Sequence, residues 1–162
     1  MKINKTLNVF LNFKNDSVEK NEIKIYDKYI AILSDLKHRD LTQTHIQLIE
    51  AELDTLNLNT NPDDRKKYYK QKLSEFQSFL KDRLALVSEG HYTSIGAGTG
   101  IVLGSIISVL FQSLLGAYFL LIGINGGIIL GAILGGFMDS EAKKQGRVLI
   151  PKIDKNTDYK KA

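Results

Sequence analysis

A long uncharged stretch constrains this chain more than any other feature. The 49 residues from Gly90 to Met138 contain no Asp, Glu, Lys or Arg, whereas a helix needs only about 20 apolar residues to cross a bilayer. A single span would leave too much apolar chain over, and irregular backbone exposed to lipid is not tolerated. We therefore predict a transmembrane hairpin over residues 91–138, with spans at about 93–112 and 117–138. The alternative is an apolar hairpin buried in a larger assembly.

Small residues recur at every fourth position in both predicted spans. The two series are Gly96, Gly100, Gly104 and Ser108 in the first span, and Gly123, Gly127, Gly131 and Gly135 in the second. Helices in hydrocarbon associate through close backbone approach, because apolar side chains gain nothing by leaving lipid. The spacing predicts that the two series pack against each other. Gly98, Gly126 and Gly136 lie off both series, which leaves open a second contact surface and hence a homo-oligomer.

Basic residues flank the predicted hairpin, and the turn between its spans is uncharged. Lys81 and Arg83 precede the first span, and Lys143, Lys144 and Arg147 follow the second. Because basic flanks stay in the cytoplasm, we expect a multi-pass membrane protein with both termini cytoplasmic. Residues 139–162 form a basic cytoplasmic tail with seven Lys and Arg against four Asp and Glu.

Apolar residues at helical spacing fill the segment that precedes the hairpin. Three helices are predicted, from about Ser17 to Lys37, from about Thr42 to Leu56, and from Pro62 onward. Asp16 or Ser17 is the expected first cap, and Gly90 either caps the third helix or joins it to the span. We expect an all-α protein, in which a cytoplasmic helical domain over 17–90 buries its Tyr, Phe and Leu stripes as a core.

The N-terminal segment, residues 1–16, fits two structures. Leu7, Val9, Leu11 and Phe13 alternate as in a strand, while Leu7, Phe10 and Leu11 also suit a short amphipathic helix. Periodicity leaves both open.

Several chemical classes find no support in the composition. Lys and Arg before residue 90 number 15 against 14 Asp and Glu, so no nucleic-acid partner is expected. The chain has no Cys, which excludes thiol chemistry. His38 and His45 lack a third ligand at metal-binding spacing, and the Gly96–Gly100 segment lacks the Lys of a phosphate loop. We expect no metal, no cofactor and no enzymatic activity.

Asn125 and Gln112 are the amide side chains of the predicted spans, and neither can ionise. Ion and proton pathways usually carry buried ionisable groups, so transport by this chain alone is not expected.

Six short segments prompt a family resemblance. They are YIAILSDL at Tyr29–Leu36, IEAELDTL at Ile49–Leu56, RKKYY at Arg65–Tyr69, FQSFLK at Phe76–Lys81, HYTSIG at His91–Gly96 and GGFMDSEA at Gly135–Ala142. With these segments the chain resembles a group of small uncharacterised membrane proteins from Bacteroidota. The resemblance implies a helical head followed by a glycine-rich hairpin, and it implies no activity. The hairpin pattern also looks like a glycine zipper, which unrelated membrane proteins share.

Two functional hypotheses follow. The first is a non-enzymatic membrane protein whose head binds a protein partner or a second copy, while the hairpin anchors it in the lipid bilayer and oligomerises. The alternative is an oligomeric pore-forming or membrane-perturbing protein, assembled through the glycines that lie off the two series.

Overall fold

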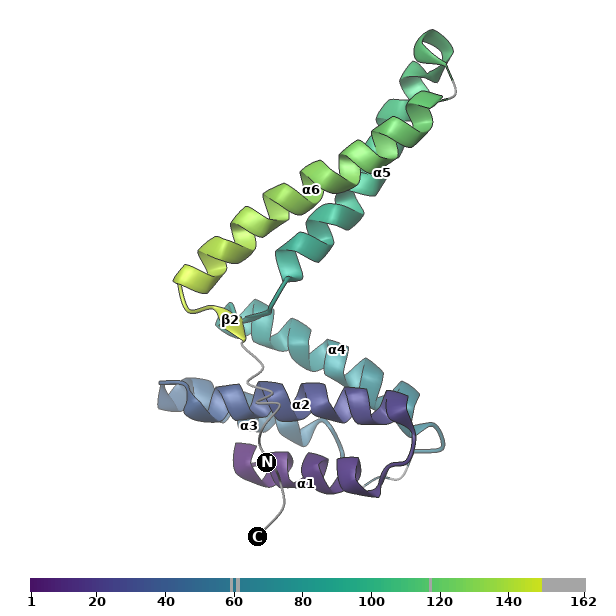
Figure 1. The fold of residues 1–162 in the computed structure, drawn as a ribbon. Helices are drawn as coiled ribbons and strands as arrows, with labels where there is room; N and C mark the ends of the chain where they lie inside the picture. Colours follow the sequence, from purple (N-terminus) through teal and green to yellow (C-terminus); the bar gives the residue numbers. More distant parts are fainter. Residues whose placement is uncertain (59, 61, 117, 150–162) are drawn as a thin grey trace. The chain divides into compact units, whose positions relative to one another are not determined.

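The computed structural model describes residues 1–58, 60, 62–116 and 118–149, with the side chains of 112–115 excepted. This part of the chain contains six helices and one two-stranded sheet, which confirms the all-α class (Figure 1). It divides into two compact units, a head over Met1–Leu86, which Leu149 joins, and a hairpin unit over Val87–Val148. Residues 150–162 of the predicted basic tail lie outside the described residues.

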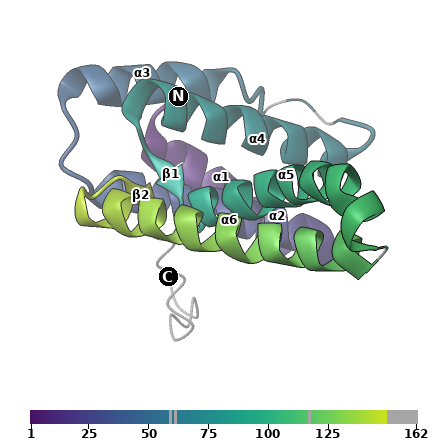
Figure 2. The ribbon, with the colours of Figure 1, turned by 90° about the horizontal axis from the view of Figure 1, so that it is seen from above.

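The head contains four helices. They are α1 (Ile3–Asp16), α2 (Lys20–His38), α3 (Gln43–Asp54) and α4 (Arg65–Leu84). Contacts join α1 to α2, α2 to α4, α4 to α3 and α3 to α1, so the four helices surround one core. The N-terminal segment is therefore a helix of the head, which adds α1 to the three helices that the periodicity predicted (Figure 2).

Aromatic side chains fill the centre of the head. Phe10 of α1 stacks on Tyr29 of α2, with ring centroids 4.1 Å apart, and it meets Tyr69 of α4 edge to face at 5.8 Å. The Tyr29 hydroxyl donates a hydrogen bond to the Tyr69 carbonyl oxygen at 3.3 Å. These side chains are fully buried, which confirms that the aromatic stripes form a core. Burying Phe10 requires α1 to be a helix that contacts both α2 and α4.

Two predicted helix starts were wrong. Helix α2 begins at Lys20 after Glu19, because Asp16 is still part of α1 and Ser17 is the residue that ends it. Helix α4 begins at Arg65, not at Pro62, because the Asp64 carboxylate accepts a hydrogen bond from the Lys67 N–H at 2.8 Å and so caps the helix.

The end of α4 also differs from the prediction. Ala85 ends the helix in the left-handed conformation with φ of 55°, five residues before Gly90. Gly90 has φ of 72° and lies between strand β1 (Val87–Ser88) and the next helix. Of the two roles predicted for Gly90, the structure therefore shows the connecting one.

The hairpin unit is built from α5 (His91–Leu115, 25 residues) and α6 (Tyr118–Lys144, 27 residues). At 1.5 Å per residue these helices are about 37 and 40 Å long, and they lie side by side in both views (Figures 1 and 2). Helix α6 includes the first six residues of the predicted tail, and β2 (Val148–Leu149) follows and pairs with β1.

Candidate functional site: the α5/α6 hairpin

The eight small residues singled out in the sequence lie where α5 meets α6. A methyl group at Gly100 would overlap the Gly127 carbonyl oxygen, and one at Gly127 would overlap the Gly100 carbonyl oxygen. The same reciprocal relation holds for Gly96 with Gly131. Since the obstacle is backbone in each case, no change of side-chain rotamer could make room for a larger residue.

We call the line of contact between the small residues of α5 and α6 the seam. Different groups meet at its two ends. A methyl group at Gly104 would overlap the Gly123 carbonyl oxygen, whereas one at Gly123 would overlap the Ser108 hydroxyl. Ser108 is fully buried, and its hydroxyl donates to the Gly104 carbonyl oxygen at 2.6 Å. At the other end, a methyl group at Gly135 would overlap the backbone of Tyr92.

Asp139 ties the base of the hairpin together. Its carboxylate accepts hydrogen bonds from the N–H groups of Tyr92 and Thr93 at 3.0 and 2.9 Å, and from the Thr93 hydroxyl at 2.6 Å. A side chain of α6 therefore caps the start of α5, where free N–H groups favour a negative charge. In the sequence, Asp139 is the first residue of the predicted basic tail. The sequence did contain a signal for this role. Asp139 follows Gly135 by four residues, which places it on the same face of α6 as the glycine series.

Backbone pairing closes the same end of the unit. The Val87 N–H donates to the Arg147 carbonyl oxygen at 2.9 Å. The Arg147 N–H in turn donates to the Ala142 carbonyl oxygen at 2.9 Å, around Gly146 with φ of 69°, as glycine-ended helices commonly do. Val87, Ala142 and Val148 are buried together, so the base is a small core of its own.

Large apolar side chains cover the outside of the hairpin. Those more than two-fifths exposed include Ile101, Val102, Ile106, Leu121, Ile129, Ile133 and Phe137. Two helical stretches, His91–Phe111 and Tyr118–Lys144, are long and apolar enough to cross a membrane. Soluble proteins rarely expose apolar patches larger than a few hundred Å², so this surface indicates a hydrocarbon or protein environment.

Three polar side chains within the two spans bond to their own helices. The hydroxyls of Thr99 and Ser105 donate to the carbonyl oxygens of Ile95 and Ile101, each at 2.7 Å. The Asn125 amide donates to the Leu121 carbonyl oxygen at 2.7 Å. This local bonding satisfies donors at membrane depth without a partner helix. The side chain of Gln112 lies outside the described residues.

The three glycines that lie off the seam have free space around them. A methyl group at Gly98 or Gly126 would meet no atom within 4 Å, and one at Gly136 would meet only the Thr93 hydroxyl at 3.8 Å. Packing between α5 and α6 therefore does not require glycine at these positions. Gly126 lines an apolar groove of about 780 Å³ along one face of the seam.

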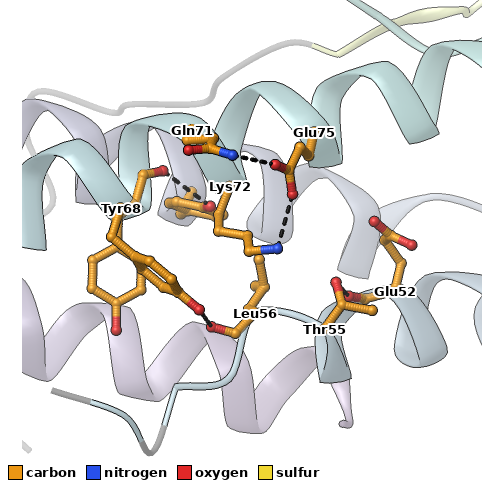
Figure 3. A network of polar contacts seen from close by, with 9 residues as sticks. Glu52, Thr55, Leu56, Tyr68, Gln71, Lys72 and Glu75 are labelled. Atoms are coloured by element: carbon orange, nitrogen blue, oxygen red, sulfur yellow. Dashed lines mark hydrogen bonds and ion pairs between the residues drawn. The ribbon is translucent and has the colours of Figure 1, made fainter. Parts of the chain in front are cut away.

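The head presents a polar surface network between α3 and α4. The Tyr68 hydroxyl donates to the Leu56 carbonyl oxygen at 3.2 Å, and the amide of Gln71 and the ammonium of Lys72 both donate to the Glu75 carboxylate at 2.9 Å (Figure 3). The hydrogen bonds from Lys72 and Gln71 hold the pKa of Glu75 below its usual value. The network is a solvated surface and not an enclosed site.

Candidate metal ligands do not gather in the described part of the chain. No group of three or more His, Cys, Asp or Glu side chains there could hold an ion. His38 directs its Nδ1 to the Ser34 carbonyl oxygen at 2.7 Å, within its own helix.

The fold and the hairpin together define an all-α protein with a helical head and two helices able to span a membrane. No family model, curated protein or solved structure matches the chain. The resemblance to the Bacteroidota group stays a prediction.

Proposed function

We propose that this chain is a non-enzymatic integral protein of a bacterial inner membrane, in which the hairpin anchors and oligomerises the protein and the head binds a protein partner. The observation that carries the proposal is the arrangement of the hairpin, with backbone-close glycines at its seam and large apolar side chains on its outside. Such an arrangement suits hydrocarbon, where small residues let helices approach and apolar side chains favour lipid.

The charged flanks support an orientation with both termini in the cytoplasm. Lys143 and Lys144 end α6, and Lys81 and Arg83 lie in the last turn of α4. The opposite end of the hairpin turns at Gly116, with φ of 83°. This turn is too short to bind a large external ligand.

An anchor is favoured over a pore because the hairpin has few polar groups free to line a path for ions. The seam is closed by backbone contact, and the side-chain donors of Thr99, Ser105 and Asn125 bond to their own helices. The described spans therefore supply no continuous polar lining. The head, whose aromatic stripes are already buried, would meet a partner through its charged outer faces.

Cysteine labelling in whole cells tests the membrane placement, because the natural chain has no Cys. Val18 in the head is 94% exposed and Tyr118 at the turn is 82% exposed, so Val18→Cys and Tyr118→Cys should leave the packing unchanged. We expect a membrane-impermeant thiol reagent to label Tyr118→Cys in intact spheroplasts and Val18→Cys only after lysis. Release of the protein from membranes by an alkaline wash would refute the anchor.

The oligomer is tested by the mass of the full-length protein in mild detergent or nanodiscs, together with the identity of proteins that co-purify. Gly136 is an open glycine of α6, where an added methyl group would meet only the Thr93 hydroxyl at 3.8 Å, so Gly136→Leu should weaken contacts between copies while leaving the hairpin folded. A monomer with no co-purifying protein would refute both interaction roles. A large homo-oligomer that conducts ions would favour the pore instead.

A further inference from the structure

The groove along the α5/α6 seam has ridges of large side chains and a floor of glycine. Residues of α5 form one ridge, including Ile95, Leu103 and Ile107, and residues of α6 form the other, including Leu130, Leu134 and Met138. Gly100, Gly127 and Gly131 lie between them. The geometry points to one acyl chain of a membrane phospholipid as the ligand of this groove, with one chain bound per hairpin. This inference rests on the membrane placement proposed above.

The lining selects an uncharged occupant without hydrogen-bonding groups. None of the described residues that line the groove carries a charged side chain. The Thr99 hydroxyl is already bonded to the Ile95 carbonyl oxygen, and Tyr92 lies in the first turn of α5, at the end of the groove. A polar ligand would lose its hydrogen bonds to water there and regain none. A hydrocarbon chain has no such bonds to lose.

The length of the groove also fits an acyl chain. From Tyr92 to Ile107 it extends along fifteen residues of α5, which is about 22 Å at the rise of a helix. One leaflet with its headgroup region supplies half of about 40–45 Å, or about 20–22 Å. The volume of about 780 Å³ lies within the range of small-molecule sites, which is roughly 300–1,000 Å³.

A second copy of the hairpin fits less well. Leu103 and Leu130 lie on the two sides of the groove and are 55% and 65% exposed, so they oppose the approach of a helix about 10 Å across more than that of a single hydrocarbon chain. A contact confined to the groove, about 22 Å long and one helix wide, would also cover roughly 200 Å², against the approximately 800 Å² per partner of a stable interface.

Two glycine variants test the inference in the full-length protein. Gly126 lines the groove and Gly98 does not, yet both have open space at the Cβ position. Gly126→Leu should therefore fill the groove without disturbing the seam, and Gly98→Leu is its matched control. The measurement is native mass spectrometry of delipidated protein in mild detergent, titrated with phosphatidylglycerol.

We expect one phosphatidylglycerol per chain in the natural protein and in Gly98→Leu, with occupancy lowered about tenfold in Gly126→Leu, equivalent to about 1.4 kcal/mol. Equal occupancy in the two variants would overturn the inference, as would absence of bound lipid in the natural protein. Dissociation of a lipid-free oligomer by Gly126→Leu would also overturn it, by assigning the groove to a second copy. The same variants are also tested for release from membranes by an alkaline wash. A protein that stays in the membrane but binds no lipid contradicts only the groove inference, whereas a protein that is released contradicts the membrane placement.

Discussion

The two units of this protein pack their helices in opposite ways. The head buries its largest side chains, so that Phe10, Tyr29 and Tyr69 are fully enclosed among four helices. The hairpin places its smallest residues where its two helices meet and turns Leu121, Leu130 and Phe137 outward, each more than three-fifths exposed. In water, burial of apolar area drives packing, whereas in hydrocarbon that drive is absent and close backbone contact replaces it.

Because of this contrast, the head and the hairpin should respond differently to a change in side-chain volume. Removing side-chain volume from the head leaves a cavity, whose energy depends on how far the surroundings collapse. Adding volume at the hairpin seam forces two backbones apart, because a Cβ there overlaps carbonyl oxygens. The head should therefore be most sensitive to truncation and the hairpin most sensitive to enlargement.

The largest effect is expected from Gly127→Leu at the middle of the seam. Its Cβ would overlap the Gly100 carbonyl oxygen and lie 3.1 Å from the Gly104 Cα, so α5 and α6 must separate. We expect a destabilisation above about 5 kcal/mol, a size that marks a specific structural fault, measured by equilibrium unfolding in detergent micelles.

Gly126→Leu is a sharp control, because the same substitution one residue earlier meets no atom within 4 Å. It should change hairpin stability by less than about 0.5 kcal/mol. Ile128→Leu, which leaves the glycine series untouched, should be similarly mild. Equal destabilisation by Gly127→Leu and Gly126→Leu would contradict the seam.

The second effect is expected from Phe10→Ala in the head. Phe10 contacts the rings of Tyr26, Tyr29 and Tyr69. Truncation to Ala removes these contacts, which pack α1 against α2 and α4. We expect a loss of about 3–5 kcal/mol, measured by urea unfolding of the full chain followed by circular dichroism. Val18→Ala, at a residue 94% exposed, should be nearly neutral. A small effect of Phe10→Ala would show that α1 is not part of the folded head.

The sequence predicts the features that depend on a local repeat better than those that depend on contacts between residues far apart in the chain. The hairpin series repeats every four residues, and this local period was enough to identify the residues from Gly96 to Gly135 that meet at the seam. Helix α1 was undecided, because the alternation around Phe10 fits two structures and only the contacts of Phe10 with α2 and α4 select the helix. The groove was not predictable either, since it depends on which side of the seam the ridges leave open.

A third, smaller effect should follow Asp139→Ala. The substitution leaves the N–H groups of Tyr92 and Thr93 without their acceptor, and loss of a helix cap typically costs about 1 kcal/mol. We expect faster hydrogen exchange at these two amides, with the middle of the seam unaffected. Ser140→Ala, at the next residue, is the control. Unchanged exchange at both amides would show that Asp139 does not hold the start of α5.

The smallest effect concerns the hydroxyl groups of the aromatic core. Among the described residues, the buried Tyr69 hydroxyl has no hydrogen-bond partner, whereas the Tyr29 hydroxyl donates to the Tyr69 carbonyl oxygen. A buried, unpaired hydroxyl is unfavourable and a paired one is mildly stabilising. Tyr69→Phe should therefore be neutral or stabilising by up to about 1 kcal/mol, and Tyr29→Phe destabilising by a similar amount.

Alkaline pH tests the burial of the Tyr69 hydroxyl by another route. Burial, with a smaller contribution from the adjacent Tyr26, raises the pKa of Tyr69 to about 12, against about 10 for an exposed tyrosine. The folded state therefore favours the neutral phenol, so its contribution is complete below about pH 10 and is lost as the pH rises toward 12. Tyr69→Phe should reduce this alkaline loss of head stability, followed by circular dichroism between about pH 9 and 12. An identical alkaline transition in Tyr69→Phe and the natural chain would show that the Tyr69 phenol already ionises in the folded head, and hence that it is reached by water.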